Sequence, residues 1–552
     1  MASESESIVR RYNALKSVRD GYWKSLWDSV RRYVMPDEKS DLPEGAQTRC
    51  RIYDTTAIEA RGRLASGMYT WMAPGDRKWF RLVPMDRRLS GNPKVESWFR
   101  SATELLSEAL ADSNFPGELV KSLNDLACGI DAVLYCEEDP KSRGLVFRCY
   151  PVESVCCQRD SRDRLDTVFR EFSMTSRQAA EYFSARDDNL PSSIREEAES
   201  DDRCDRQNCI LHAVFPRRVR QEKAIGQERM PFKSVFIDLK TRTAIREGGY
   251  EEFPYAVCRF RKSVRESYGR GPGIDALPDI RMLNRMREGF LRNCDFAADP
   301  SWMIPEGSLV SRNFNRAPGG VIFYRPGLSG ARPEPVPRGN NPSLDSELIE
   351  MERRRIRNMF YWDVFDPLGD LRNMTAQEAT IRNESKLIPF GPIACNIHND
   401  LLQPMLERAF GILARSGMLD APPPELQNGG GYKVEFMSRI ALSMKRQSAM
   451  GWIQTEGTIQ GIAASRPDVL DNFDADRIVR DIAESNGCDG AWFRRTDERD
   501  RIREDRQKAL MEQQQQEQAK AVMSSAGQLG KRPEAGSPMQ GLLSSLASQA
   551  GE

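Results

Sequence analysis

The sequence is poor in histidine. It contains only His212 and His398 in 552 residues, far apart in the chain. Histidine is the side chain that most often transfers protons near neutral pH, so acid–base catalysis has little to build on. Cys204, Cys209 and His212 have a C-x4-C-x2-H spacing, but the second ligand pair of a structural zinc site is missing. We therefore predict no catalytic residues, no metal site and no cofactor, and interpret His398 as an ordinary residue on the polar face of a helix.

Long hydrophobic runs are also missing. No apolar stretch approaches the ~18 to 20 residues that cross a bilayer, and the start MASESESIVRR lacks the order of charges and apolar residues in a secretory signal. We expect a soluble chain with no membrane partner. The twelve cysteines have no regular spacing, which favours reduced, mostly buried thiols over a disulfide framework.

Neither charge is in excess, since 81 Lys and Arg residues balance 81 Asp and Glu residues. Tight binding of DNA phosphates requires positive faces, so the balanced total suits DNA that slides over the protein, although clustered patches are compatible with it.

A chain of 552 residues exceeds what one hydrophobic core usually organises, so we expect several subdomains or an elongated molecule. No repeat of ~20 to 50 residues is visible, so the sequence does not support a solenoid or a propeller.

Nucleotide-binding motifs are incomplete. The segment GRGPG at 269–273 precedes a helix but lacks the Lys-Ser/Thr pair of a P-loop and the third glycine of a dinucleotide fingerprint. The alternative is a flexible joint before that helix, because glycine permits unusual dihedral angles. The pair Gly530-Lys531 is followed by arginine near the C-terminus, so the chain is not predicted to be a packaging ATPase.

What the sequence does contain is a series of helical and strand periods. Apolar residues at three- and four-residue steps predict a helix over 4–35, anchored by Trp23 and Trp27 and ending before Pro36. Capping-box spacing at Thr56/Glu59 and at Thr175/Gln178 predicts two further helix starts. Other helices are predicted at 93–112 and from about Pro116, and strands in the segments WFRLVPM, AVLYCEED, LVFRCYPV, TVFREF, CILHAVF, SVFIDL and YAVCRF.

The middle of the chain predicts two long amphipathic helices around a small β tip. The first begins near Ile274, tolerates Pro278 in its first turn and ends near 299–300; the second covers about 343–360. Between them, WMIPEG and GVIFYRP resemble short strands. A further helix with a kink at Pro404 ends at Gly417, and the chain after 432 is predicted to be helical as far as the glutamine-rich run at 512–518.

The second long helix carries the candidate binding residues. Its segment EMERRRIR could present arginines to phosphate from one helix face, or it could be a solvated helix with internal ion pairs. The aromatic stretch that follows it reads equally as a set of core anchors or as an exposed loop. Residue patterns alone leave both choices open.

Four segments, taken in order, resemble the portal, or head-to-tail connector, family of short-tailed bacteriophages. They span roughly residues 8 to 510 and read YDTTAIEARGRLASGMYTWMAPGDRKWFRL, YGRGPGIDALPDIRMLNRM, MTAQEATIRNESKLIPFGPIACNIHNDLLQPMLERAFGIL and DVLDNFDADRIVRDIAE. The resemblance implies an α+β, predominantly helical, elongated fold with wing, stem, clip and crown, assembled as a ring. Its implied parts are the wing (1–273), first stem helix (274–299), clip (300–342), second stem helix (343–360), tunnel loop (361–374), wing helices (375–431), crown (432–524) and disordered tail (525–552).

The family's role implies a non-enzymatic protein of the virion, at the portal vertex of the capsid, present in the host cytoplasm during assembly. It would form a homododecameric ring through which double-stranded DNA is packaged and ejected. Implied partners are the terminase large subunit, the major capsid and scaffolding proteins, the tail adaptor and internal core proteins. We hypothesise that Arg353, Arg354 and Arg357 line the DNA channel, and that the tunnel loop contains Phe360, Tyr361, Trp362 and Phe365.

Two other classes of protein remain as alternatives. Another structural phage component, such as an internal core or tail-tube protein, would lack the order of helix, β tip and helix found at 274–360. A DNA-processing enzyme, such as a nuclease or a metal-dependent hydrolase, would need a convergent carboxylate or histidine cluster, and none stands out in the sequence.

Overall fold

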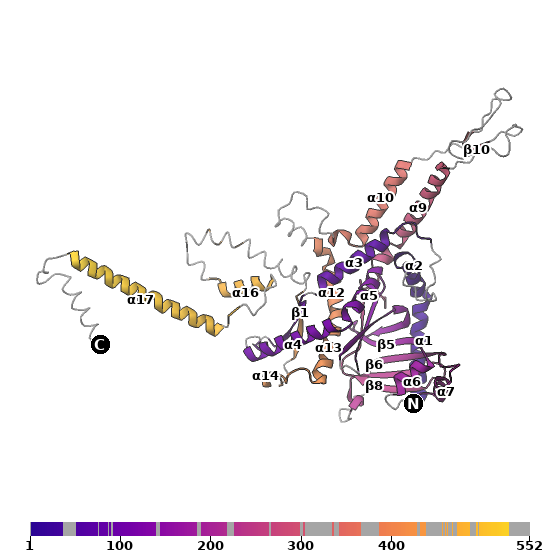
Figure 1. Ribbon diagram of the computed structural model, residues 1–552, viewed down its shortest axis with the longest axis horizontal. Helices are drawn as coiled ribbons and strands as arrows, with labels where there is room; N and C mark the ends of the chain where they lie inside the picture. Colours follow the sequence, from indigo (N-terminus) through magenta and orange to yellow (C-terminus); the bar gives the residue numbers. More distant parts are fainter. Residues whose placement is uncertain are drawn as a thin grey trace, which may run out of the picture. The chain divides into compact units, whose positions relative to one another are not determined.

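The computed structural model divides into two compact units, Met1–Lys445 and Arg446–Glu552 (Figure 1). No helix among the described residues is both long enough and apolar enough to cross a bilayer. The structure describes residues 2–36, 51–75, 77–86, 88–89, 92–139, 144–184, 189–217, 226–263, 266–298, 302–303, 334–335, 342–365, 386–427, 431–437, 472–485, 493–494 and 496–528, and residues 455, 459, 461 and 466.

The N-terminal helix is confirmed, with an interruption that the sequence did not indicate. It consists of α1 (Ala2–Val18), a π-helical turn at Arg19–Trp23 and α2 (Lys24–Val34), and it ends before Pro36. Trp23 and Trp27 are buried and pack against Tyr268, whose ring centroid lies 5.0 Å from that of Trp27. The predicted tryptophan anchors are therefore correct.

Two antiparallel sheets form the strand-rich part of the first unit, where the alternating pattern predicted strands. The five-stranded sheet has order β4-β5-β6-β7-β8 and the three-stranded sheet has order β3-β2-β9. Helix α1 covers one face of the larger sheet, and α6 (Ser176–Ser184) and α7 (Ser192–Glu199) cover the other (Figure 1). The strands are β2 (Ala132–Glu138), β3 (Leu145–Tyr150), β4 (Val155–Arg159), β5 (Leu165–Thr175), β6 (Gln207–Pro216), β7 (Phe232–Asp238), β8 (Ala244–Tyr250) and β9 (Tyr255–Cys258).

Of the two predicted capping boxes, one is confirmed and one is wrong. At the start of α6 the Gln178 amide nitrogen donates to Thr175 Oγ1 at 3.2 Å, and the Thr175 amide donates to Gln178 Oε1 at 3.0 Å. At the start of α3 (Thr56–Met72), Thr56 is already helical, and its amide donates instead to Asp54 Oδ1 at 3.0 Å. A carboxylate two residues earlier has taken the capping role.

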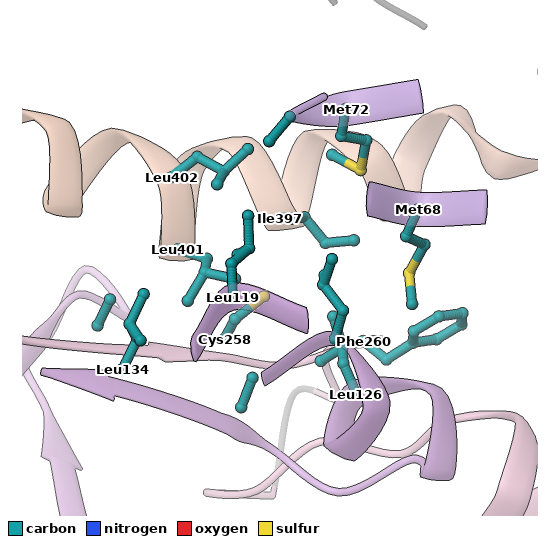
Figure 2. Packing of buried hydrophobic residues seen from close by; sticks show 14 of the residues in the cluster. Met68, Met72, Leu119, Leu126, Leu134, Cys258, Phe260, Ile397, Leu401 and Leu402 are labelled. Atoms are coloured by element: carbon teal, nitrogen blue, oxygen red, sulfur yellow. The ribbon is translucent and has the colours of Figure 1, made fainter. Parts of the chain in front are cut away.

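The main core lies between the smaller sheet and three helical segments, α3, α5 (Phe115–Cys128) and the broken helix at 391–416. Figure 2 shows their side chains pointing toward one another. The labelled side chains are all fully or almost fully buried: Met68, Met72, Leu119, Leu126, Leu134, Cys258, Phe260, Ile397, Leu401 and Leu402.

The helix with the predicted kink at Pro404 contains a π-helical turn. It consists of α12 (Gly391–Ile397), the π turn at His398–Leu402 and α13 (Gln403–Ser416), followed by Gly417 with φ +78°. Proline has no amide hydrogen to donate, and here it occupies the first turn of α13, where that loss is tolerated. The predicted C-terminus at Gly417 is correct, and a π-helical turn lies just before Pro404, where the sequence predicts a kink.

The prediction of an all-helical chain after 432 is wrong at its beginning. Tyr432–Phe436 forms β12, which pairs antiparallel with β1 (Phe80–Pro84) in the first unit. Arg81 donates to Glu435 at 2.7 Å across this pair. The neighbouring helices are α4 (Pro93–Asp112), which confirms its predicted bounds, and the short α14 (Pro424–Gln427).

His398 is buried, and its interpretation as a polar-face residue is also wrong. Its ring stacks on Phe436 of β12 at a centroid distance of 4.1 Å and an angle of 11°. Burial lowers the pKa of His398 to about 4, because a charged imidazolium would lose its hydration there. The neutral imidazole of His398 therefore helps to hold β12 in place.

The glycines at 269–273 form a close packing contact, which corrects their interpretation as a flexible joint. None of them has a positive φ, and the left-handed glycine here is Gly129, with φ +84°. A Cβ on Gly271 would lie 2.7 Å from the Cα of Gly129, and a Cβ on Gly273 would overlap the carbonyl of Cys128. The end of α5 thus touches the backbone just before α8 (Pro272–Asp275).

The second unit is described mainly through two helices, α16 (Ala475–Ser485) and α17 (Thr496–Gln528). Arg499 and Arg503 of α17 donate to Asp476 of α16 at 2.9 and 2.6 Å. The predicted disordered tail at 525–552 is wrong for its first residues, since α17 continues to Gln528; the remainder lies outside the described residues.

We expect Gly273→Ala to destabilise the first unit by about 1–3 kcal/mol, as overpacking of a tight contact does. Thermal unfolding of the full chain measures the effect. Gly62→Ala in α3 is the matched control, because a Cβ there meets nothing within 4 Å and alanine favours a helix by up to about 1 kcal/mol. Equal melting temperatures for Gly273→Ala and the unchanged chain would refute the close contact.

We expect His398 to make the chain less stable as the pH drops from about 6.5 toward 4. The unfolded chain protonates His398 near its ordinary pKa, while the folded chain resists until about 4, so the unfolded state binds more protons in this window. Urea unfolding midpoints of His398→Phe should depend less on pH. His212, whose pKa is also lowered by burial, acts in the same direction, whereas Asp131, whose pKa burial raises to about 7, stabilises the fold as the pH falls. An unchanged profile in His398→Phe would exclude the role of His398.

Candidate functional site

The two predicted long helices are present and run side by side (Figure 1). They are α9 (Leu277–Ala298) and α10 (Pro342–Met359), and Pro278 lies in the first turn of α9 as expected. Beyond them, β10 (Trp302–Met303) pairs antiparallel with β11 (Glu334–Pro335). The segment GVIFYRP lies outside the described residues, but the order of helix, β tip and helix is confirmed.

A buried polar cluster ties the base of this helix pair to the start of α3. The Asp54 side chain is 1% exposed and accepts hydrogen bonds from Arg353 Nη2 and Nε at 2.7 and 2.9 Å. Asn284 Oδ1 on α9 accepts the amide of Tyr53 at 2.9 Å, and Asn284 Nδ2 donates to the carbonyl of Ile280. Three elements far apart in the sequence are therefore joined by hydrogen bonds.

The carboxylate of Asp54 is stabilised in its charged form. Burial alone would raise its pKa, but hydrogen bonds from Thr56 and Arg353 outweigh burial and hold the pKa of Asp54 below its ordinary value. The sequence analysis did not single out Asp54 or Asn284. A signal did exist for Asn284, since it is a polar residue on the same helix face as Ile280 and Leu283.

The hypothesised channel arginines are in different environments. Arg353 is engaged by Asp54 and by Glu350 at 2.5 Å, so its side chain is occupied within the chain. The Arg357 guanidinium lies 5.3 Å from the centre of the Trp362 ring. Arg354 is exposed, and no hydrogen bond or ion pair joins its side chain to another residue of the described chain.

The aromatic residues after α10 resolve the choice between core anchors and an exposed loop. Phe360 is fully buried and Phe365 is 7% exposed; the Phe365 ring lies so close to Gly67 that no Cβ would fit there. Tyr361 has φ +56° and ends the helix, and Trp362 is half-buried beneath Arg63 at 4.2 Å. Phe360 and Phe365 are therefore core anchors of the first unit.

The remainder of the hypothesised tunnel loop, 366–374, lies outside the described residues, as does the helix start predicted at Thr375–Glu378. Phe365, the last described residue before this segment, is anchored by its ring contact with Phe390, whose centroid lies 5.3 Å away.

The residues that could have formed a catalytic, metal or phosphate site are His212, the Cys and acidic side chains, and the glycines at 269–273. His212 is buried, with its ring nitrogens 2.7 Å from Tyr255 Oη and 2.9 Å from Ser234 Oγ. No cluster of three or more His, Cys, Asp or Glu side chains suited to a metal ion occurs in the described ranges. Gly271 and Gly273 lie against backbone, and Gly269 lies against the side chains of Arg259 and Asp131, so these glycines are closely packed and leave no space there for a phosphate.

We expect Arg353→Met to lower the free energy of unfolding by about 1.5–3 kcal/mol, because the buried Asp54 carboxylate loses a charge-assisted hydrogen-bond donor. Arg354→Met on the same helix is the matched control and should change stability by less than about 0.5 kcal/mol. Urea unfolding of both full-length variants measures this difference. Equal losses, or none for Arg353→Met, would contradict the structural role of Arg353.

Comparison with known proteins identifies the family. A profile described as "Bacteriophage head to tail connecting protein" matches residues 5–493. The chain is 27% identical over 508 residues to a "Probable portal protein" of Bordetella phage BPP-1, covering 88% of each chain. It is 26% identical over 544 residues to the "Portal protein" of Salmonella phage epsilon15, covering 96% of this chain and 95% of that one.

A solved chain from the virion of a native gene transfer agent particle aligns over 78% of this chain and 89% of its own length, with 11% identity and a TM-score of 0.36. The match to the head-to-tail connecting profile, in contrast, covers most of the sequence. It confirms the resemblance predicted from the four ordered segments. The chain therefore belongs to the family of bacteriophage head-to-tail connecting proteins, the phage portal proteins.

Proposed function

We propose that this portal protein assembles as a ring at one capsid vertex, where double-stranded DNA passes through it during packaging and ejection. The observation that carries the proposal is a set of exposed apolar side chains on the helix pair. They are Met282, Leu291, Phe296, Leu348 and Met351, with exposed fractions between 38% and 56%. Apolar surface concentrated on one helical hairpin favours coverage by another copy of the chain.

The parts of the ring follow from the family's architecture. In this proposal, α9 and α10 are the stem, 300–342 is the clip and the segment after Phe365 is the tunnel loop. The strand-rich region and the helices at 375–431 form the wing. We place the start of the crown after β12 instead of at 432, since β12 pairs with β1 in the first unit.

The proposed partners follow the same assignment. A dodecameric ring would contact the terminase large subunit and later the tail adaptor through the clip. The wing would meet the major capsid and scaffolding proteins, and the crown would meet internal core proteins. The protein would be part of the virion after assembly in the host cytoplasm. The family is structural, which supports a protein without enzymatic activity.

Electron microscopy of the purified full-length protein tests the ring directly. Rings with a central hole wide enough for duplex DNA would support the proposal. A population made only of monomers or of solid particles would overturn it, whatever the affinity of the protein for DNA.

We expect Met351→Asp to shift the protein from rings toward monomers. Met351 is 56% exposed on α10, and a carboxylate buried in a contact between copies would lose its hydration. The matched control is Met418→Asp, because Met418 is 46% exposed after α13, away from the helix pair. Size-exclusion chromatography measures the ring fraction; equal fractions for the two variants would show that α10 does not contact a neighbouring copy.

A further inference from the structure

Three of the four arginines near the end of α10 are already engaged inside the chain. Arg353 pairs with Asp54 and Glu350, and Arg355 pairs with Asp279 of α9 at 3.1 Å. Arg357 lies over the Trp362 ring. Arg354 is exposed, and its guanidinium has no partner within the part of the chain that the structure describes. It is therefore the arginine of this cluster that is available to a ligand.

Arg354 belongs to a polar stripe along one exposed face of α10. The stripe consists of Glu347, Glu350, Arg354 and Asn358, all exposed and separated by three or four residues, so they lie above one another on the helix surface. The opposite face carries Ile349 and Ile356, which are buried against the rest of the first unit. The polar stripe thus points away from the core.

An apolar stripe adjoins the polar one. Leu348 and Met351 are 38% and 56% exposed, and they lie about 100° and about 40° around the helix from Glu347. Apolar side chains suit the contact with a neighbouring copy.

The sign of charge changes once along the polar stripe. Glu347 and Glu350 lie toward the β tip, and Arg354 lies toward the aromatic turn at the base. Glu347 and Arg354 are separated by seven residues, about 10 Å at ~1.5 Å per residue. The helix dipole favours acids at the start and bases at the end, but it acts mainly within the terminal turns. The dipole does not account for Glu350 at mid-helix, whose carboxylate is already paired with Arg353 at 2.5 Å.

We propose that this stripe forms a charge step in the ring lumen, in which Arg354 attracts the phosphates of duplex DNA and Glu347 repels them. The inference rests on the proposed ring function. DNA phosphates would be held at the level of Arg354, near the base of the helix pair, and would pass the tip end without binding. Because the contact is electrostatic and exposed, its affinity falls as the salt concentration rises. Ions screen the charges, and the release of counterions from the DNA becomes less favourable.

The test uses full-length rings and a short blunt-ended fluorescent duplex at ~0.1 M salt, with Arg354→Glu as the main variant. Ring assembly should be retained, and the affinity for the duplex should fall by at least about tenfold, with a shallower dependence on salt. Arg354→Lys should restore most of the affinity, because lysine keeps the charge. Glu347→Lys should tighten binding.

Arg285→Glu is the matched control on α9. Arg285 is exposed and, among the described residues, has no ion-pair partner, so the same reversal of charge is introduced on the other helix of the pair. We expect its affinity to stay within about threefold of the unchanged ring. Equal losses in Arg285→Glu and Arg354→Glu would overturn the step, since net charge alone would then explain binding.

The remaining outcomes separate this inference from the proposed function. If unchanged rings bind the duplex and Arg354→Glu rings bind it equally well, the charge step is wrong while the portal ring stands. If Arg354→Glu prevents ring assembly, Arg354 is in a contact between copies and the step is also wrong. If the unchanged chain forms no ring, the proposed function itself fails.

Discussion

The buried carboxylate of Asp54 is the constraint on which the orientation of the helix pair depends. A charge placed in the interior is stable only when its hydrogen-bonding capacity is met, and here the Thr56 amide and the Arg353 guanidinium meet it. The neighbouring amide of Tyr53 is bound by Asn284. One short segment before α3 therefore fixes both α9 and α10 where they leave the core.

A second constraint acts on the chain segments that lead into α9 and out of α10. Gly271 approaches the left-handed Gly129 so closely that neither position leaves space for a side chain, and the aromatic anchors Phe360 and Phe365 close the return from α10. The helix pair is thus held at its entry by backbone contact and at its exit by aromatic packing. A hairpin secured in this way can project from the core and still keep a defined direction.

The sequence predicted elements whose cause is local. Periodicity identified the N-terminal helix, α4, both long helices and most strands, since burial of one face imposes the same period wherever an element lies. The capping box at Thr175 and the helix end at Gly417 were also correct, because both depend on a few adjacent residues. The order of four long segments sufficed for the family, which the comparison then confirmed.

What the tertiary structure alone decided were pairings between distant residues. The strand β12, the stacking of His398 on Phe436 and the engagement of Arg353 by Asp54 each join residues hundreds of positions apart or on different elements. Local patterns carry no record of such partners. An arginine that faces solvent and one that neutralises a buried carboxylate look alike in the sequence; the fold determined that Arg353 is engaged and Arg354 is exposed, because only it brings Asp54 to α10.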